Sequence, residues 1–248
     1  LKFIEKTPSF GRSLICLDDK INSSIIQYIK NKNYLTYGTN KKSNFRIENI
    51  NENVEFSKFN IAINLPGKKK YTLRNVQIPN FGIHNIRNAT AAVGITYLIG
   101  ISNRIIKQGL KNFQGVQRRY NHIFNYRKSI FIDDYAHHPT EIRTVLNGIA
   151  KVYKKQKIYC IFQPHRISRL KYLKDQFAGC FKKADFLILC PIFKAGEKIK
   201  LNFEYKNFAK QIIDQSNVNL IMIKDENDLL KYVKQNIYGE NIVIGMGA

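Results

Sequence analysis

The chain has 248 residues, of which 44% are hydrophobic, so it can bury a sizeable core and does not have the composition of a disordered chain. Its formal net charge of +23 favours anionic ligands. The Lys and Arg residues are scattered over nearly every segment, without an Arg-rich arm, an RNP-type aromatic motif or zinc-finger spacing. A general lysine bias therefore explains the charge better than a nucleic-acid-binding face, and a basic nucleic-acid-binding module remains only as a remote alternative.

The chain contains four cysteines, Cys16, Cys160, Cys180 and Cys190. They form no CxxC pair, and three of them lie in apolar runs. This pattern predicts a reduced, cytoplasmic protein without disulfides or structural zinc. The sequence shows no run of eighteen or more apolar residues and no signal peptide, so we expect no membrane partner.

The first third of the chain is rich in β-like runs with irregular spacing. Apolar residues predict strands over 13–17 and 34–38, with a short helix over 21–30 between them. Residues 40–79 are expected to form several short strands, with turns at 51–53 and 66–68. This pattern is typical of a mixed α/β region.

Two helices are expected next. The first begins after Gly82, and its small residues indicate close packing; they are Ala89, Ala91, Ala92 and Gly94. The second covers 103–112 and leads to 113–116, which we interpret as a domain junction. The predicted domains are therefore 1–114 and 115–248.

From Ser129 onward, strand-like and helix-like segments alternate regularly. Strands are expected over 129–133, 158–162, 185–190, 219–223 and 241–245. Helices are expected over 139–152, 170–182, 206–214 and 226–236. Such alternation predicts a parallel sheet. The predicted fold class is α/β, with a Rossmann-like, mostly parallel sheet and flanking helices, preceded by a partial, mixed α/β domain.

Two polar segments stand directly after predicted strands. Residues 133–141 read Asp-Asp-Tyr-Ala-His-His-Pro-Thr-Glu, and residues 163–169 read Gln-Pro-His-Arg-Ile-Ser-Arg. In an open parallel α/β sheet, ligands bind outside the carboxyl ends of the strands. We therefore expect the chemistry of the chain at these two segments.

The first polar segment has three possible interpretations. A metal site is disfavoured because the adjacent His137 and His138 project in different directions and no third ligand lies at helical spacing. In a structural interpretation, His138 starts the helix and one aspartate accepts bonds from backbone N–H groups. In the interpretation that we favour, a carboxylate binds ligand hydroxyl groups while Tyr135 and His137 face a substrate.

Arginine residues occur in pairs at two places. Arg166 and Arg169 lie where a loop turns into a helix, and guanidinium groups bind carboxylate or phosphate in a bidentate manner. The helix N-terminus adds positive potential there, so we predict anion recognition. Arg118 and Arg119 follow the predicted domain junction and are either a clamp on a phosphate oxygen or a solvated charge pair.

The segment His84-Asn85-Ile86-Arg87-Asn88 places two amides near a helix start. Amides suit the edge of a base because each carries both donors and an acceptor. Capping of the helix by Asn85 is an alternative explanation for one of them. The phosphate-loop pattern GxxxxGK[ST] is absent from the sequence, so the chain carries residues suited to a base and an acceptor without a triphosphate loop.

Together these motifs resemble those of the Mur ligase family. The similar segments are, in chain order, Pro8–Asp19, His84–Asn88, Gly115–Arg119, Asp133–Glu141, Gln163–Arg169 and Ala195–Glu197. The resemblance covers almost the whole chain. The pairing of the two polar segments is its specific part, whereas the His-Asn motif and the first arginine pair are shared across the wider family.

The resemblance implies that the chain is part of a three-domain ligase. Residues 1–114 would be the rear of the central ATP-binding domain, and 115–248 the C-terminal, amino-acid-binding domain. The N-terminal domain and the phosphate loop would be missing. The chain opens at Leu1 and stops after a strand-like run, so we interpret it as a fragment that is inactive alone.

The resemblance also assigns roles to individual residues. The cofactor-binding residues would be His84, Asn85 and Asn88 at adenine, Arg119 at the γ-phosphate and Asp134 at the ribose. The residues around the incoming amino acid would be Tyr135, His137, Arg166 and Arg169. Arg119 and His137 are the predicted catalytic residues, and no metal ligand is assigned within this chain.

The implied reaction joins L-alanine to UDP-N-acetylmuramate through an acyl phosphate, as a step in peptidoglycan synthesis in the cytoplasm. ATP and Mg²⁺ are the implied cofactors, with metal ligands expected mainly in the missing part of the protein. A ligase that recycles murein tripeptide is the nearest alternative because it shares the loop with two adjacent histidines. Arg166 and Arg169 favour alanine, since a bulkier acceptor should demand a different loop there.

Overall fold

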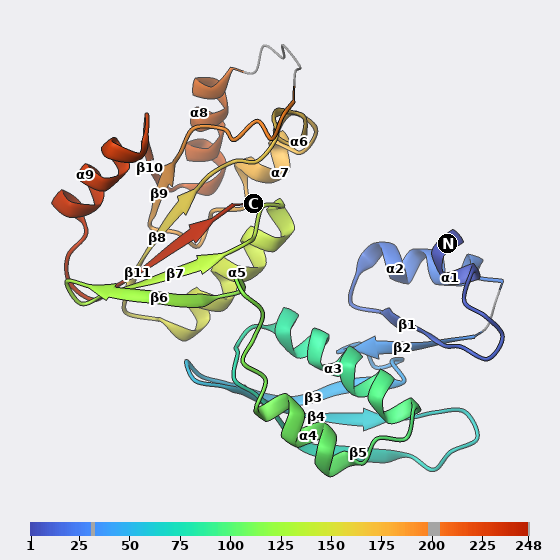
Figure 1. The fold of residues 1–248 in the computed structure, drawn as a ribbon. Helices are drawn as coiled ribbons and strands as arrows, with labels where there is room; N and C mark the ends of the chain where they lie inside the picture. Colours follow the sequence, from blue (N-terminus) through green and yellow to red (C-terminus); the bar gives the residue numbers. More distant parts are fainter. Residues whose placement is uncertain (31–32, 198–203, 248) are drawn as a thin grey trace. The chain divides into compact units, whose positions relative to one another are not determined.

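The structure is a computed structural model that describes residues 1–30, 33–197 and 204–247. It divides into two compact units, Leu1–Gly115 and Val116–Ala248, called here the N-terminal and C-terminal units (Figure 1). Both are built from a sheet with flanking helices, which confirms the predicted α/β class. The functional roles predicted for the two domains remain predictions.

The N-terminal unit contains a five-stranded sheet with the order β1-β2-β3-β4-β5. Strands β1 to β3 run parallel, and β4 and β5 are antiparallel to their neighbours. The strands are β1 (Ser13–Cys16), β2 (Tyr34–Gly38), β3 (Phe45–Glu52), β4 (Ser57–Ile63) and β5 (Tyr71–Ile78). The helices are α1 (Lys2–Glu5), α2 (Lys20–Ile25), the 3-10 helix η1 (Ile26–Tyr28), α3 (Ile83–Leu98) and α4 (Asn103–Lys111).

The core of this unit lies between the sheet and α3 and α4. Alternate residues of β4 are buried, because successive side chains of a strand point to opposite faces. Ile86 and Val93 of α3 pack into the same cluster. The small residues of α3 permit the predicted close approach: a Cβ at Gly94 would lie 2.7 Å from Leu14 Cδ1.

The C-terminal unit contains a six-stranded sheet with the order β10-β9-β8-β11-β7-β6. All neighbouring strands are parallel except β6, which is antiparallel to β7. The strands are β6 (Asn121–Tyr126), β7 (Ser129–Asp134), β8 (Lys157–Phe162), β9 (Phe186–Leu189), β10 (Asn219–Met222) and β11 (Asn241–Met246). The helices are α5 (Pro139–Val152), α6 (Ile167–Tyr172), α7 (Lys174–Ala178), α8 (Tyr205–Ser216) and α9 (Glu226–Asn236).

Helix α5 follows from its sequence in the predicted way. Pro139 occupies its first turn, and the predicted apolar stripe is buried from Ile142 to Ile149. The side chain of His138 accepts a bond from the backbone of Thr140, and Glu141 bonds back to the backbone of His138, forming a capping box. The structural interpretation of His138 is therefore confirmed.

Two elements of the C-terminal unit differ from the sequence-based expectation. Strand β6 was not predicted, since its side chains are mostly exposed and show no alternation. Its turn uses Arg127 and Lys128, both with positive φ, in place of the Asn-Gly or Asp-Gly pair that usually marks a hairpin. The prediction of a single helix over 170–182 was wrong, because Leu173, with φ −113° and ψ 19°, separates two short helices.

The four cysteines are free thiols, in agreement with the prediction of no disulfides. Cys160, Cys180 and Cys190 are buried, and burial raises the pKa of each thiol. Among the described residues, no helix combines the length and apolar character needed to cross a membrane.

Candidate functional site

The two polar segments come together at one edge of the C-terminal sheet. Strand β11 pairs in parallel with both β7 and β8, so the loops that follow β7 and β8 leave the sheet at the same edge. We call residues 135–138 the β7 loop and residues 163–166 the β8 loop. The rings of His137 and His165 lie 6.3 Å apart between their centroids, so the loops are neighbours.

Asp134 anchors the β7 loop through its carboxylate. Its Oδ2 accepts a bond of 2.9 Å from the backbone N–H of Tyr120, and Oδ1 accepts one of 2.8 Å from Ala136. The residue is 2% exposed, and its burial raises the pKa of the carboxyl despite these two bonds. One aspartate therefore accepts backbone bonds, as the structural interpretation proposed. The predicted ribose contact of Asp134 remains a prediction, and Asp133 is the more exposed carboxylate of the pair.

His137 is held in a single hydrogen-bonding arrangement. Its Nδ1 lies 2.8 Å from the carbonyl oxygen of Tyr135. Because a carbonyl only accepts, Nδ1 carries the proton in the neutral ring, and Nε2 is then an acceptor. The ring also makes an edge contact with that of Tyr135, at 5.0 Å between centroids. His137 therefore presents an acceptor atom beside an aromatic side chain.

The β8 loop is fixed by bonds to the segment that follows β9. Arg166 has a left-handed backbone with φ 70°, a conformation that costs a non-glycine residue about 1–3 kcal/mol. Two backbone bonds hold it there: Arg166 N–H donates to Phe193 O at 2.9 Å, and Phe193 N–H donates to Pro164 O at 2.8 Å. Surrounding bonds can maintain a strained backbone conformation, and these two bonds do so for Arg166 at the start of α6.

Glu197 binds the first turn of α6 from outside the helix. Its carboxylate accepts bonds from the backbone N–H of Ser168, at 3.2 Å, and from the Ser168 hydroxyl. The bond from the Ser168 hydroxyl is the main reason why the pKa of Glu197 is lowered. Because Arg166, the N-cap residue of α6, makes no side-chain cap bond, Glu197 supplies the acceptor that this helix start lacks.

Two polar atoms of the same region are buried without a partner among the described residues. These are Arg169 Nη1 and His165 Nδ1. A buried unpaired donor costs about 1–3 kcal/mol, so such atoms point to a ligand or water that completes them. Burial, and then the positive charges of Arg169 and Arg166, lower the pKa of His165. The site therefore combines two guanidinium groups with a neutral imidazole, which suits a small carboxylate.

The two arginines after the domain junction differ in their surroundings. Arg118 is engaged: Nε lies 3.1 Å from Asp133 Oδ2, Nη2 donates to Gly247 O at 2.9 Å, and the guanidinium lies over the Tyr135 ring. Arg119 is exposed, and its positive charge acts on two nearby carboxyl groups, that of Asp134, whose pKa burial nevertheless raises, and that of Glu141. Arg118 is thus the engaged member of the pair, and the predicted contact of Arg119 with the γ-phosphate remains a prediction.

A pocket of about 340 Å³ opens at the same edge of the sheet. Its polar lining includes Arg118, Asp133 and Gln163, together with Asp225 and Glu226 at the start of α9. Asp133 and Gln163 are the first residues of the two polar segments. The pocket therefore extends the candidate site from the β7 and β8 loops toward α9.

The N-terminal unit carries the predicted base-binding residues at the start of α3. The helix begins after Gly82, whose φ of 96° favours glycine and whose N–H donates to Glu52 Oε1 at 2.7 Å. Asn85 Nδ2 donates back to Phe81 O at 2.8 Å, so this side chain does not cap a helix N–H group. Its amide oxygen is not used in that bond, and Asn88 is exposed. His84 is half-buried in the same turn.

Metal ligands are not gathered in this part of the protein. Within residues 1–30, 33–197 and 204–247, no group of three or more His, Cys, Asp and Glu side chains could hold a metal ion. Because Mg²⁺ is often held by one or two carboxylates together with substrate phosphates, the expected place of its ligands remains a prediction.

Some functional features lay outside the sequence-based predictions. The segment Ala195-Gly196-Glu197 was recognised as a similarity without a role, and the structure places Glu197 at the helix that carries Arg166 and Arg169. The unpaired Nδ1 of His165 was also not anticipated. The position of His165 between a proline and an arginine, at the end of a strand, was the available signal.

Comparison with known proteins identifies the family. Residues 1–96 match the family model of the Mur ligase middle domain, and residues 118–248 match that of the Mur ligase, glutamate ligase domain. The chain therefore belongs to the Mur ligase family, which confirms the resemblance and does not favour the nucleic-acid-binding alternative.

Individual relatives narrow the similarity further. The chain is 59% identical over 248 residues to UDP-N-acetylmuramate–L-alanine ligase from Pelagibacter ubique (strain HTCC1062), covering all of this chain and 53% of that protein. Among solved structures, it is similar to UDP-N-acetylmuramate-alanine ligase from Thermotoga maritima, with a TM-score of 0.72, 23% identity, and coverage of 95% of this chain and 47% of that one. It also resembles a murein peptide ligase from Psychrobacter arcticus 273-4, with a TM-score of 0.68, 20% identity, and coverage of 98% and 49%.

These comparisons carry different weights. The two structural similarities are below 25% identity and define the fold alone, so they do not separate the alanine ligase from the murein peptide ligase. The sequence similarity is to proteins named for L-alanine. The chain spans about half the length of the curated relatives that it matches.

Proposed function

We propose that this chain supplies the rear of the ATP-binding domain and the amino-acid-binding domain of an ATP-dependent ligase that joins L-alanine to UDP-N-acetylmuramate. The complete ligase would be about twice as long, as its relatives are. It would act in the cytoplasm, in the synthesis of peptidoglycan precursors. Since the phosphate loop is absent from this sequence, the chain alone should not turn over ATP.

The observation that carries the proposal is the arrangement of the β8 loop. Arg166 and Arg169 stand at the start of α6, and Arg169 Nη1 is buried without a partner in the described residues. A carboxylate of a small amino acid would complete this donor in a bidentate manner. Tyr135 and His137 come from the neighbouring β7 loop and would limit the size of the acceptor's side chain.

His137 has a specific role in this proposal. With Nδ1 bonded to the carbonyl of Tyr135, its Nε2 accepts a hydrogen bond from the amine of L-alanine and holds the nitrogen lone pair toward the acyl carbon. The muramyl carboxylate oxygen attacks the γ-phosphorus of ATP, releasing ADP. The neutral amine then attacks the carbonyl carbon of the resulting acyl phosphate; the C–N bond forms, the C–O bond to phosphate breaks, and the nitrogen releases one proton to solvent. The protein positions reactants and balances charge in both steps, so no side-chain nucleophile is required.

On the nucleotide side, we assign adenine to His84, Asn85 and Asn88, and the γ-phosphate to Arg119. The support for this assignment is the exposed amide of Asn88, the amide oxygen of Asn85 that its bond to Phe81 does not use, and the exposed guanidinium of Arg119. Magnesium would be held mainly by residues outside this chain, as the family resemblance implies.

The test uses the full-length protein that contains this chain. Phosphate release is followed with ATP, magnesium and UDP-N-acetylmuramate, while L-alanine, other amino acids or murein tripeptide are offered as acceptors. Release that depends on L-alanine is expected, and Arg169→Ala should raise the KM for L-alanine at an unchanged KM for ATP. Release with tripeptide alone would transfer the assignment to the recycling ligase.

A further inference from the structure

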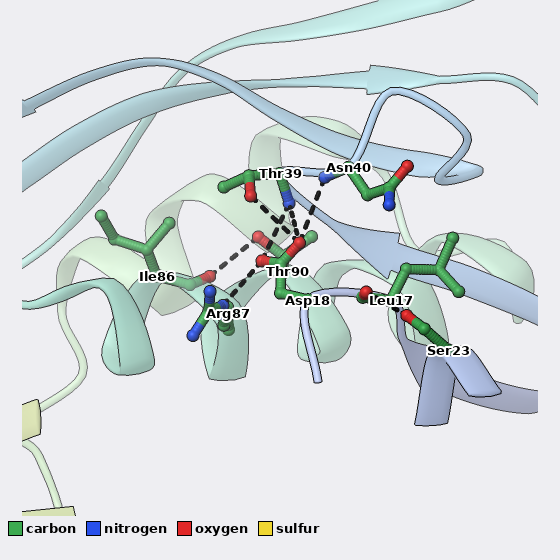
Figure 2. A network of polar contacts seen from close by, with 8 residues as sticks. All are labelled: Leu17, Asp18, Ser23, Thr39, Asn40, Ile86, Arg87 and Thr90. Carbon is green, nitrogen blue, oxygen red and sulfur yellow. Dashed lines mark hydrogen bonds and ion pairs between the residues drawn. The ribbon is translucent and has the colours of Figure 1, made fainter. Parts of the chain in front are cut away.

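An ion pair with a buried carboxylate lies just after the carboxyl end of β1, outside the proposed contacts. Four donors bind the carboxylate of Asp18 (Figure 2). Thr39 donates its N–H at 2.9 Å and its hydroxyl at 3.0 Å, and Asn40 donates its N–H at 3.1 Å. Arg87 Nε on α3 donates at 2.7 Å. The Asp18 side chain is 5% exposed, whereas that of Arg87 is 32% exposed and Thr39 and Asn40 lie at the surface, so only the carboxylate is shielded from solvent.

The buried carboxylate of Asp18 carries a charge. Burial raises the pKa of Asp18, but the bonds from Thr39 and Arg87 outweigh it and hold the pKa below its ordinary value. The carboxylate is therefore ionised near neutral pH. The charge-assisted bond from Arg87 Nε, at 2.7 Å, ties α3 to the segment that follows β1.

The turn after β2 is shaped around the same carboxylate. Gly38 has φ of +137°, and a Cβ there would lie 2.6 Å from Asp18 Oδ1. The chain can approach the carboxylate closely enough for the N–H groups of Thr39 and Asn40 to bind it only because residue 38 has no side chain. Asp18 thus joins three segments: the end of β1, the turn after β2, and α3.

The position of Arg87 on α3 links this cluster to the nucleotide assignment. Arg87 stands between Asn85 and Asn88, and Figure 2 shows its side chain directed at Asp18. At the N-terminal end of α3, the N–H of Gly82 donates to the carboxylate of Glu52 and holds the start of the helix. The first turns of α3 are therefore fixed at both ends, by one bond at Gly82 and by one ion pair at Arg87.

We propose that Arg87 is a positioning residue for base recognition: its ion pair with Asp18 sets the rotation of α3 that brings the amides of Asn85 and Asn88 to the edge of adenine. The inference rests on the proposed adenine contact. Arg87 does not touch the base. Its removal lets the helix start turn or shift, which weakens hydrogen bonds that depend on direction.

The test compares ATP with inosine triphosphate in the full-length protein. Adenine carries an amino group that can donate to an amide oxygen, and the base of inosine triphosphate lacks it. Arg87→Met should lower the ratio of kcat/KM for ATP to that for inosine triphosphate by about 5- to 10-fold, the lower range of one bidentate base contact. The KM for ATP should rise with kcat near wild type, and Arg87→Lys should restore part of the ratio. Arg46→Met, which removes an ion pair with Glu48 on β3, is the matched control and should leave the ratio unchanged.

Asp18→Asn supplies the second variant, and it is used alone if Arg87→Met fails to fold by circular dichroism. The double variant should lose no more selectivity than the larger single loss, because both residues act through one contact. Folded variants that keep the wild-type ratio, or losses that add, would overturn the positioning role. If Asn88→Ala also leaves the ratio unchanged, the adenine contact itself is wrong, which separates the two failures.

Discussion

Asp134 offers the sharpest test of how the β7 loop is built. In Asp134→Asn, an amide NH₂ replaces one of the two oxygens that accept backbone bonds. Whichever way the amide turns, the NH₂ faces the N–H of Tyr120 or of Ala136, so one buried donor loses its acceptor. Such a loss costs about 1–3 kcal/mol. A chain of this size loses about 2–4 °C of melting temperature per kcal/mol, so the expected shift is about 2–12 °C.

The matched control is the neighbouring carboxylate. Asp133 pairs with the exposed Arg118, so Asp133→Asn should cost about 0–1 kcal/mol. Both variants are compared by thermal unfolding followed by circular dichroism. Equal melting temperatures for the two variants would refute the anchoring role of Asp134. The predicted ribose contact is measured separately, as a rise in the KM for ATP in the full-length protein.

Three further predictions concern other parts of the structure. Gly38→Ala should lower the free energy of unfolding by about 3 kcal/mol. Gly67→Ala, at a position with positive φ but open space, should lower it by about 1–2 kcal/mol. Equal losses for the two variants in a denaturant titration would contradict this prediction. Burial raises the pKa of Glu141, but bonds from backbone N–H groups lower it overall, so its stabilisation is complete above its ordinary pKa of 4.5 and is lost as the pH falls through the lowered value. Glu141→Gln should therefore flatten the acid side of the stability profile, and an unchanged profile would exclude this role. Glu197→Ala should raise the KM for L-alanine about three- to tenfold at an unchanged KM for ATP, because α6 loses its external cap; steady-state kinetics that move both KM values equally would contradict it.

The regular part of the fold could be predicted because its signals are local. Strands β7 to β11 carry apolar runs, and α5 has a stripe from Ile142 to Ile149 at helical spacing. The positions of the polar segments at strand ends then predicted the edge at which the β7 and β8 loops meet. Strand β6 was not predicted because it lies at the edge of the sheet, where its exposed side chains lack the alternation on which strand prediction depends.

The site's finer geometry could not be predicted because it depends on contacts between distant segments. Arg166 takes a left-handed backbone owing to bonds with Phe193, and nothing in the local sequence indicates it. Adjacent aspartates look equivalent in the sequence, yet only Asp134 is turned inward to the backbone of Tyr120 and Ala136. Periodic patterns can be recognised in the local sequence, whereas hydrogen bonds between distant segments cannot be predicted from any single position.

The central place of β11 has a consequence for the order of assembly. This strand comes last along the C-terminal unit, yet it lies between β7 and β8 and is the surface against which both pair. During synthesis, β7 and β8 emerge more than a hundred and about eighty residues earlier, respectively, and have no direct pairing with each other. The edge at which the β7 and β8 loops meet therefore cannot form on a nascent chain until residue 246 has left the ribosome. Truncation before β11 would leave β7 and β8 without the strand that joins them, so an early stop would separate the β7 and β8 loops.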